Sequence, residues 1–207
     1  MKLINLTAPF HCAHIFTERI PLKSPRTAYT GLVYHFRHGS METSYLDLPG
    51  HIAETDDGRH AANIDLLDYY RQKTLLLRIK PTAAEYGVTP EDLEKALNGR
   101  EWTPFVVINA QGVANDGYEP ARKIYLTLEA VDYLAANGIK VLLSDAWESV
   151  RLDGVFLRLF DAGISAVCNL VNLNKLPAEG EFLTTVSFPP YPGAVTQIPV
   201  SVIAEVE

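Results

Sequence analysis

The chain has 207 residues, of which 47% are apolar and 21% charged, so it can bury one good core. We expect a single domain over residues 1–207, in which residues 1–27 form a further strand or an N-terminal arm. The net charge of −7 argues against a nucleic-acid partner, and no apolar run has the ~18 to 20 residues of a membrane span.

Short apolar runs bounded by turn residues predict buried strands along the chain. A stretch rich in β-branched and aromatic residues, 28–45, is typical of a bent strand or hairpin. The further strands are expected over residues 74–79, 105–109, 140–144 and 163–167. The C-terminal quarter, 182–206, has alternating β-formers and several prolines, which favours strands and connecting loops at a sheet edge.

Three helices are expected between these strands. Thr89 is a good N-cap before Pro90, and Asn98-Gly99 follows as a stop signal. The segment 127–137 repeats this pattern, and a third helix is predicted over 154–162. Helices between strands, with a β-rich start and finish, indicate an α/β fold with a mixed sheet.

Cysteine and histidine are scarce. The two cysteines, Cys12 and Cys168, form no CxxC pair, which excludes a zinc ribbon and fits a reducing compartment. The start of the chain has no signal-peptide pattern, so we expect a cytoplasmic protein that acts on a small molecule. No histidine follows His60.

The segment from Met41 to His51 is the most informative. Met41, Tyr45 and Asp47 share parity, so a straight strand would place all three side chains on one face. Asp47 and His51 bracket a corner stiffened by Pro49. The alternative is that Asp47 caps a turn and His51 is an ordinary surface histidine.

Asp47-x-Pro49-x-His51 resembles the end of the signature of the cyclase family, which includes isatin hydrolase and bacterial kynurenine formamidase, an arylformamidase of tryptophan catabolism. Further similar segments follow in order at 51–58, 64–70, 88–93, 128–140, 144–149 and 159–173, so the resemblance covers about residues 28–206. It implies a swivelling β/β/α domain assembled as a homodimer. It also implies hydrolysis or closure of an acyl C–N or C–O bond on a small, often aromatic, substrate.

The resemblance also implies a metal site, but the ligand positions are changed. The family binds zinc or manganese through two motif histidines, an aspartate, a later histidine and a glutamate. These positions fall on Met41, Tyr45, Asp47, Phe156 and Cys168. Only Asp47 is kept, and thioether, phenol and phenyl groups are poor or null ligands for a hard divalent ion. We therefore expect weak metal binding or none, and the changes argue against conventional kynurenine formamidase activity.

Two interpretations of the altered site involve Cys168. A Cys168-His51-Asp47 set would support nucleophilic catalysis on an amide, lactam or lactone, in which His51 deprotonates the thiol and Asp47 orients the imidazole. The simpler alternative is a small buried cysteine that fills the space of the lost carboxylate. In the second interpretation, Asp47, His51 and Cys168 form a rebuilt zinc site.

The third interpretation is a pocket without chemistry, in a small-molecule-binding or regulatory pseudo-hydrolase. Tyr45, Trp147 and Glu148 would then line it, and Met41 and Phe156 are further candidates for contacts with a substrate.

Weaker candidates lie elsewhere along the chain. His11, Cys12 and His14 are close in sequence. His35 and His38 differ in parity, so they cannot both face the pocket unless Gly39 introduces a bulge. Two acids, Asp145 and Glu148, follow a predicted strand end, where functional groups are common; they are equally well explained as a helix cap and a solvated neighbour. The shape of the pocket is expected to depend on loops such as 115–119.

Overall fold

The computed structural model describes residues 1–11, 14–112, 122–177 and 180–207. Its centre is a curled nine-stranded sheet with the order β1-β13-β11-β5-β7-β9-β10-β4-β12. The four strands from β5 to β10 run parallel, and the pairs on either side of them are antiparallel. The strands are β1 Lys2–Asn5, β4 Tyr45–Asp47, β5 Gln72–Arg78, β7 Phe105–Asn109, β9 Val141–Ser144, β10 Ser165–Cys168, β11 Glu181–Ser187, β12 Gln197–Pro199 and β13 Ser201–Val206.

Three helices lie within the expected ranges, because their ends are specified locally. In α1 (Pro90–Leu97), the Thr89 side chain accepts from the Asp92 N–H and the Asp92 side chain accepts from the Thr89 N–H, which makes a capping box. The Thr127 side chain caps α2 (Leu128–Ala136) by accepting from the Ala130 N–H, and α3 spans Val155–Asp161. Short 3₁₀ turns are Ser40–Glu42, Pro49–His51, Ala53–Thr55, Leu66–Tyr69 and Leu173–Lys175.

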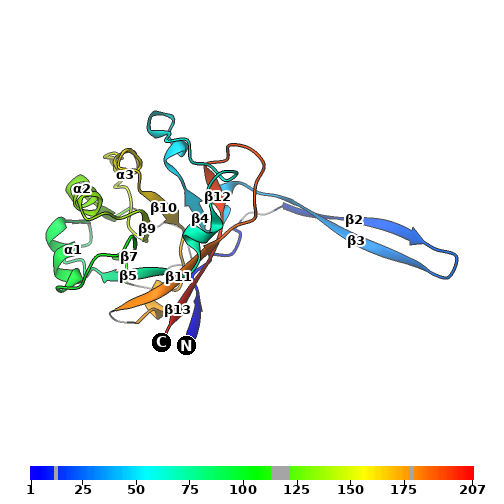
Figure 1. Ribbon diagram of the computed structural model, residues 1–207, viewed down its shortest axis with the longest axis horizontal. Coiled ribbons are helices and arrows are strands. Elements are labelled where there is room, and N and C mark those ends of the chain that lie inside the picture. Colours follow the sequence, from blue (N-terminus) through cyan, green and yellow to red (C-terminus); the bar gives the residue numbers. More distant parts are fainter. Residues whose placement is uncertain (12–13, 113–121, 178–179) are drawn as a thin grey trace.

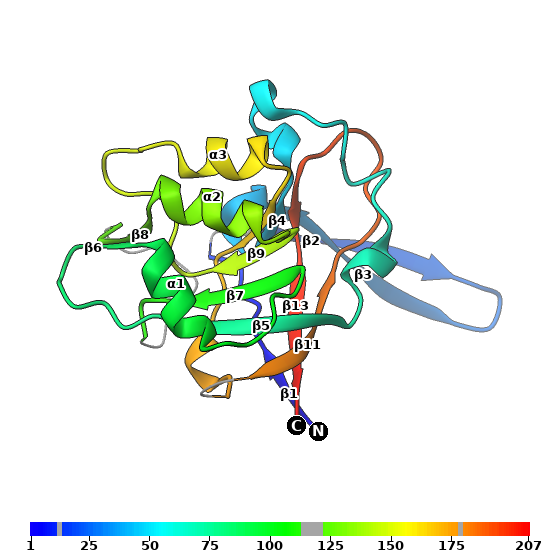
Figure 2. The same cartoon turned by 60° about the vertical axis from the view of Figure 1, so that its left-hand side comes forward.

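The sheet separates two hydrophobic cores. One face packs against the three helices, which lie together on one side of the sheet in Figure 2. The other face is enclosed by the curl of the sheet itself, since the side chains of β13, β11 and β4 meet there. Successive strand residues therefore point to different cores: Leu75 and Leu77 face the helices, and Leu76 faces the inside of the curl. This arrangement confirms the predicted mixed α/β fold.

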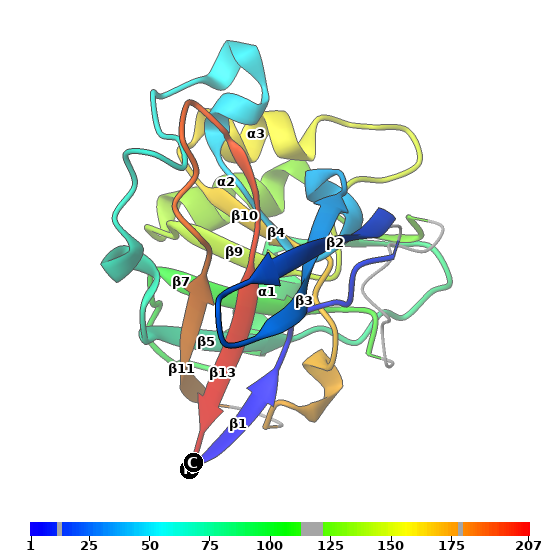
Figure 3. The same ribbon diagram turned by 90° about the vertical axis from the view of Figure 1, so that its right-hand side faces the viewer.

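A long hairpin stands apart from this body. Its strands, β2 (His14–Lys23) and β3 (Ala28–Arg37), pair with each other over ten residue pairs and with no other strand of the described ranges. Figure 1 shows this arm, residues 14–37, extending away from the side of the molecule opposite the helices, and Figure 3 shows it end-on. A separate two-stranded parallel pair joins β6 (Tyr86–Val88) to β8 (Ile124–Leu126) near the helices.

The expectation of a straight strand from Met41 to Asp47 is wrong. β3 ends at Arg37, and the chain makes a 3₁₀ turn over Ser40–Glu42 before β4 begins at Tyr45. The alternation of side chains is broken by this turn, so only Tyr45 and Asp47 share a strand face. Among the described residues, no helix is both long and apolar enough to cross a membrane.

Candidate functional site

The candidate site lies on β4, near one edge of the sheet. β4 is held between β10 and β12, and Asp47 is directly opposite Gln197 of β12. Tyr45 is directly opposite Cys168 of β10. Alternation along β4 directs Tyr45 and Asp47 to the helix side of the sheet and Leu46 to the inner core.

A tight turn returns His51 to Asp47. Pro49 is buried at the start of the 3₁₀ turn, and Gly50 packs closely against the segments around it. A Cβ atom on Gly50 would lie 2.7 Å from the Asp56 carboxylate and 2.9 Å from the Thr196 methyl group, so only glycine fits without a shift. In this turn, Nδ1 of His51 lies 3.7 Å from Oδ1 of Asp47.

Gln197 connects these two side chains. Its Nε2 lies 3.5 Å from Asp47 Oδ1 and 3.5 Å from His51 Nε2. The Ser40 hydroxyl donates to the Gln197 carbonyl oxygen, which directs the amide nitrogen toward Asp47 and His51. An amide that donates to His51 Nε2 favours the tautomer with the proton on Nδ1, the nitrogen nearer Asp47.

Burial makes Asp47 a weak acid. Its side chain is 4% exposed, and desolvation raises its pKa from 3.8 to about 7, although the hydrogen bond from Gln197 lowers it. His51, in contrast, has a 43% exposed side chain. The site therefore pairs a buried carboxyl that titrates near neutrality with an imidazole that solvent reaches.

The other positions implied by the family resemblance form an apolar cluster. Tyr45, Cys168 and Trp147 are buried in the helix-side core, and Phe156 packs against it. The rings of Trp147 and Phe156 stack with their centroids 5.2 Å apart. Cys168 is 2% exposed, so its thiol is enclosed by this core rather than open to solvent.

Glu148 and Met41 lie in different surroundings. The Glu148 carboxylate accepts hydrogen bonds from the backbone N–H groups of Gly154 and Phe156, and so caps the start of α3. Met41 is exposed on the 3₁₀ turn before β4, and its carbonyl accepts a bond from Asn169.

Asp145 has a structural role at the end of β7. It is buried and accepts hydrogen bonds from the Asn109 side chain and from the backbone of Ala110 and Gln111. Burial raises its pKa. It therefore fixes the chain that leaves β7.

The weaker histidine candidates lie on or near the arm. His14 and His35 belong to its two strands, where His35 stacks on Phe16 and pairs with Glu18. The His38 ring packs on Phe10. Cys12 and the loop 115–119 lie outside the described residues.

A family model described as "Putative cyclase" matches residues 4–149, well over half of the chain. The chain belongs to the Cyclase family. No curated protein was found to match it. Three solved structures share the fold of this cyclase-family chain: a "predicted metal-dependent hydrolase" from Bacillus stearothermophilus, isatin hydrolase A from Labrenzia aggregata and a "novel cyclase".

The likeness to these structures extends over nearly the whole cyclase-family chain. The TM-scores are 0.69, 0.69 and 0.73 at 17%, 17% and 16% identity. The matches cover 98%, 98% and 99% of this chain, and 97%, 93% and 88% of the other chains. At such identities they establish the fold, and the chemistry must be argued from the residues present.

The residues present do not fit the metal site that the family resemblance implies. Of the five corresponding positions, only Asp47 carries a carboxylate, the hard oxygen donor that such an ion prefers. Tyr45 and Phe156 are packed in or against the helix-side core, and Met41 is exposed. Within the described ranges, no three His, Cys, Asp or Glu side chains lie close enough together to hold an ion. Asp47, His51 and Cys168 thus do not form a three-ligand cluster.

Sequence reasoning missed Gln197 and Ser40. Both come close to Asp47 only through the pairing of β12 with β4, which joins segments 150 residues apart. No local motif marks either residue, so only the strand register could have identified them.

Proposed function

We propose that this protein is a small-molecule hydrolase or cyclase that acts on an amide, lactam or lactone bond through His51, without the metal set implied by the family resemblance. The observation that carries the proposal is the group formed by Asp47, His51 and Gln197, where a solvent-exposed imidazole is held beside a buried carboxyl. Isatin hydrolases among the structural neighbours support a cyclic, aromatic substrate.

In this proposal His51 moves the proton. Its Nε2 gives up the 3.5 Å contact with the Gln197 amide and takes a proton from water as the water oxygen bonds to the acyl carbon. The protonated imidazole then gives that proton to the departing nitrogen or oxygen as the acyl bond breaks. Ring closure is the reverse sequence. Asp47 is a positioning residue, because it faces Nδ1 and favours the tautomer in which Nε2 is basic.

Cys168 does not serve as nucleophile in this proposal. A nucleophilic thiol needs an accessible sulfur and a base within hydrogen-bond reach. Cys168 is 2% exposed in the helix-side core, which fits the space-filling role better.

The competing candidate is a non-catalytic binding protein of the same fold. It is favoured by the stacking of Trp147 on Phe156, because the family resemblance implies a metal-binding histidine at the position of Phe156. The two candidates differ in their dependence on His51, because a binding protein needs no proton transfer.

The test is acid release from isatin, N-formylaniline and dihydrocoumarin, followed in a pH-stat with and without a chelator. We expect turnover of at least one compound, unchanged by the chelator, and a loss of about 100-fold or more in His51→Ala. His14→Ala, on the arm, is the matched control and should keep full activity. Equal turnover by the wild-type protein and His51→Ala would contradict the role of His51, and binding of these compounds without turnover by either would favour the binding protein.

We also propose that two copies of the chain dock through their arms. Both faces of the arm are apolar: Phe36, Tyr34 and Leu32 lie on one face, and Phe16 and Tyr29 on the other. These five side chains are largely exposed, although a two-stranded hairpin alone is marginally stable in water. Such an arm needs a partner surface over both faces.

The charge distribution favours a second copy as that partner. Between residues 14 and 37 the arm carries four Lys or Arg residues and one Glu, so its net charge is +3. The whole chain carries −7, which leaves −10 on the remainder. An arm of one copy is therefore attracted to the body of another.

Size-exclusion chromatography with light scattering tests this assembly. We expect a dimer for the wild-type chain and a monomer for the double variant Phe16→Asp/Phe36→Asp, which places one charge on each arm face. Leu66→Asp/Leu67→Asp changes two exposed apolar residues of the body and is the matched control. A wild-type monomer, or an arm variant that still dimerises, would contradict the proposal.

A further inference from the structure

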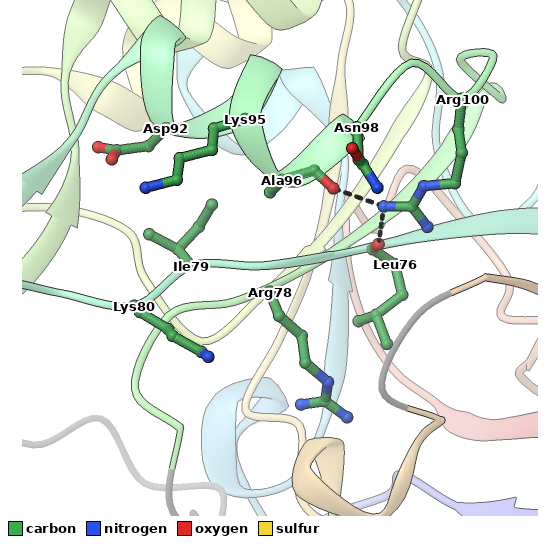
Figure 4. Close-up of a pocket in the computed structure, with 9 residues that line it drawn as sticks. All are labelled: Leu76, Arg78, Ile79, Lys80, Asp92, Lys95, Ala96, Asn98 and Arg100. Atoms are coloured by element: carbon green, nitrogen blue, oxygen red, sulfur yellow. Dashed lines mark hydrogen bonds between the residues drawn. The ribbon is translucent and has the colours of Figure 1, made fainter.

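A cavity of about 460 Å³ lies far from the candidate acyl site, between the end of β5 and helix α1. Figure 4 shows its walls: strand residues on one side, and the helix with the turn that follows it on the other. The lining residues are Leu76, Arg78, Ile79, Lys80, Asp92, Lys95, Ala96, Asn98 and Arg100. In the order of the sheet, β7, β9 and β10 separate β5 from β4.

The lining of this cavity is strongly positive in an acidic protein. Among the described residues that line it, four are Lys or Arg and one, Asp92, is acidic, while the whole chain has a net charge of −7. The Asp92 carboxylate is already engaged, since it accepts hydrogen bonds from the Tyr86 hydroxyl and the Thr89 backbone N–H. The cavity therefore holds an excess of positive charge that its own carboxylate only partly offsets.

The two arginines supply fixed charge. Arg100 donates to the carbonyl oxygens of Leu76, at 3.1 Å, and Ala96, at 2.6 Å. Arg78 donates to the carbonyl oxygens of Leu173 and Leu176. All these acceptors are neutral, although Arg78 also interacts electrostatically with the buried Asp145. The hydrogen bonds therefore hold both guanidinium groups in place without cancelling the charge of Arg100.

The two lysines supply free charge. Lys80 and Lys95 are exposed, and neither forms an ion pair with a carboxylate in the part of the chain that the structure describes. Their ammonium groups come from opposite walls, Lys80 after β5 and Lys95 on α1. The dipole of α1 accounts for cations in its last turn, but it does not account for those on the strand.

We propose that this cavity binds a small phosphate monoester with an apolar substituent. Ile79 and Ala96, on the helix side of the sheet, offer an apolar surface for the substituent. Lys80 and Lys95 contact the phosphate as point charges, a role that lysine fills in phosphate sites. A phosphate, with nearly two negative charges at neutral pH, fits the net positive charge of the cavity better than a carboxylate does.

Titration calorimetry with phenyl phosphate at low ionic strength tests this proposal. We expect one bound ligand per chain, weaker binding as salt is added, and a loss of affinity of about 10-fold or more in Lys80→Glu/Lys95→Glu. The double variant Lys2→Glu/Lys140→Glu makes the same change in net charge at exposed positions outside the cavity, and should bind within about twofold of wild type.

Three results would overturn the proposal. One is no measurable binding of phenyl phosphate at millimolar concentration. Another is equal loss of affinity in the two double variants, because that would show a response to net charge alone. The third is binding of benzoate or phenol as tight as that of phenyl phosphate, which would exclude recognition of the phosphate. Matching circular dichroism spectra of the two variants would exclude misfolding as the cause of a loss.

Discussion

Replacing Asp47 with asparagine should stabilise the protein more at pH 8 than at pH 5. Burial raises the pKa of Asp47 from 3.8 to about 7, so the native state holds a proton that the unfolded chain releases between these values. Stability from this group is fully present below about pH 4 and is lost as the pH rises through 7. The full cost of ionising Asp47 in the native state is about 4 kcal/mol.

The assay is urea unfolding of wild type and Asp47→Asn at pH 5 and pH 8. Asparagine keeps an oxygen that accepts from Gln197, so the substitution removes the charge and retains the hydrogen bond. Other titrating groups cancel in the difference between the two proteins. We expect that difference to change by about 2.5 kcal/mol between pH 5 and pH 8, because the unfolded Asp47 carboxyl is already largely ionised at pH 5. Glu54→Gln, at an exposed carboxylate, is the control and should show no such change.

A variant that is destabilised at pH 8 would refute this reasoning. It would mean that the native Asp47 carboxylate is ionised and paired with a cation, such as a bound metal ion or protonated His51, so that its pKa is low. An unchanged difference at the two pH values would equally show that Asp47 titrates alike in the native and unfolded states.

Three further predictions concern neighbouring residues. Native protein should label at Cys168 with iodoacetamide at least about 100-fold more slowly than unfolded protein, as followed by peptide mass analysis; fast native labelling would contradict its burial. Glu148→Ala should lower the free energy of unfolding by about 1 kcal/mol, because the N–H of Gly154 loses its acceptor, and Glu148→Gln should recover part of this in urea unfolding. Gln197→Ala should raise the pKa of Asp47 above about 7 in an NMR titration, and a lower pKa would be inconsistent with the hydrogen bond.

The elements that were predicted correctly are those with local signals. Thr89, Pro90 and Asn98 fix the limits of α1 through interactions within a few residues, so the sequence alone is sufficient to place it. The apolar runs of β5 and β7 are likewise marked by their composition and by the turn residues that bound them.

The site could be predicted only in part, because its contacts are long-range. Asp47 and His51 are four residues apart and were identified together from the corner at Pro49. Gln197 meets them through strand register, which composition and spacing do not encode. Met41 was wrongly predicted to share a strand face with Tyr45 and Asp47. The 3₁₀ turn at Ser40–Glu42, which breaks the strand, has no signal in the alternation of residues.

The two faces of the arm have a consequence for how the protein resists degradation. Among the described residues, the strands β2 and β3 pair only with each other, so they can open without disturbing either core of the body. In a dimer, opening the arm must also break the contact with the second copy, and dilution removes that protection by mass action. Hydrogen exchange and protease cleavage within residues 14–37 should therefore become faster as the protein is diluted, while the nine-stranded sheet keeps the same protection at every concentration.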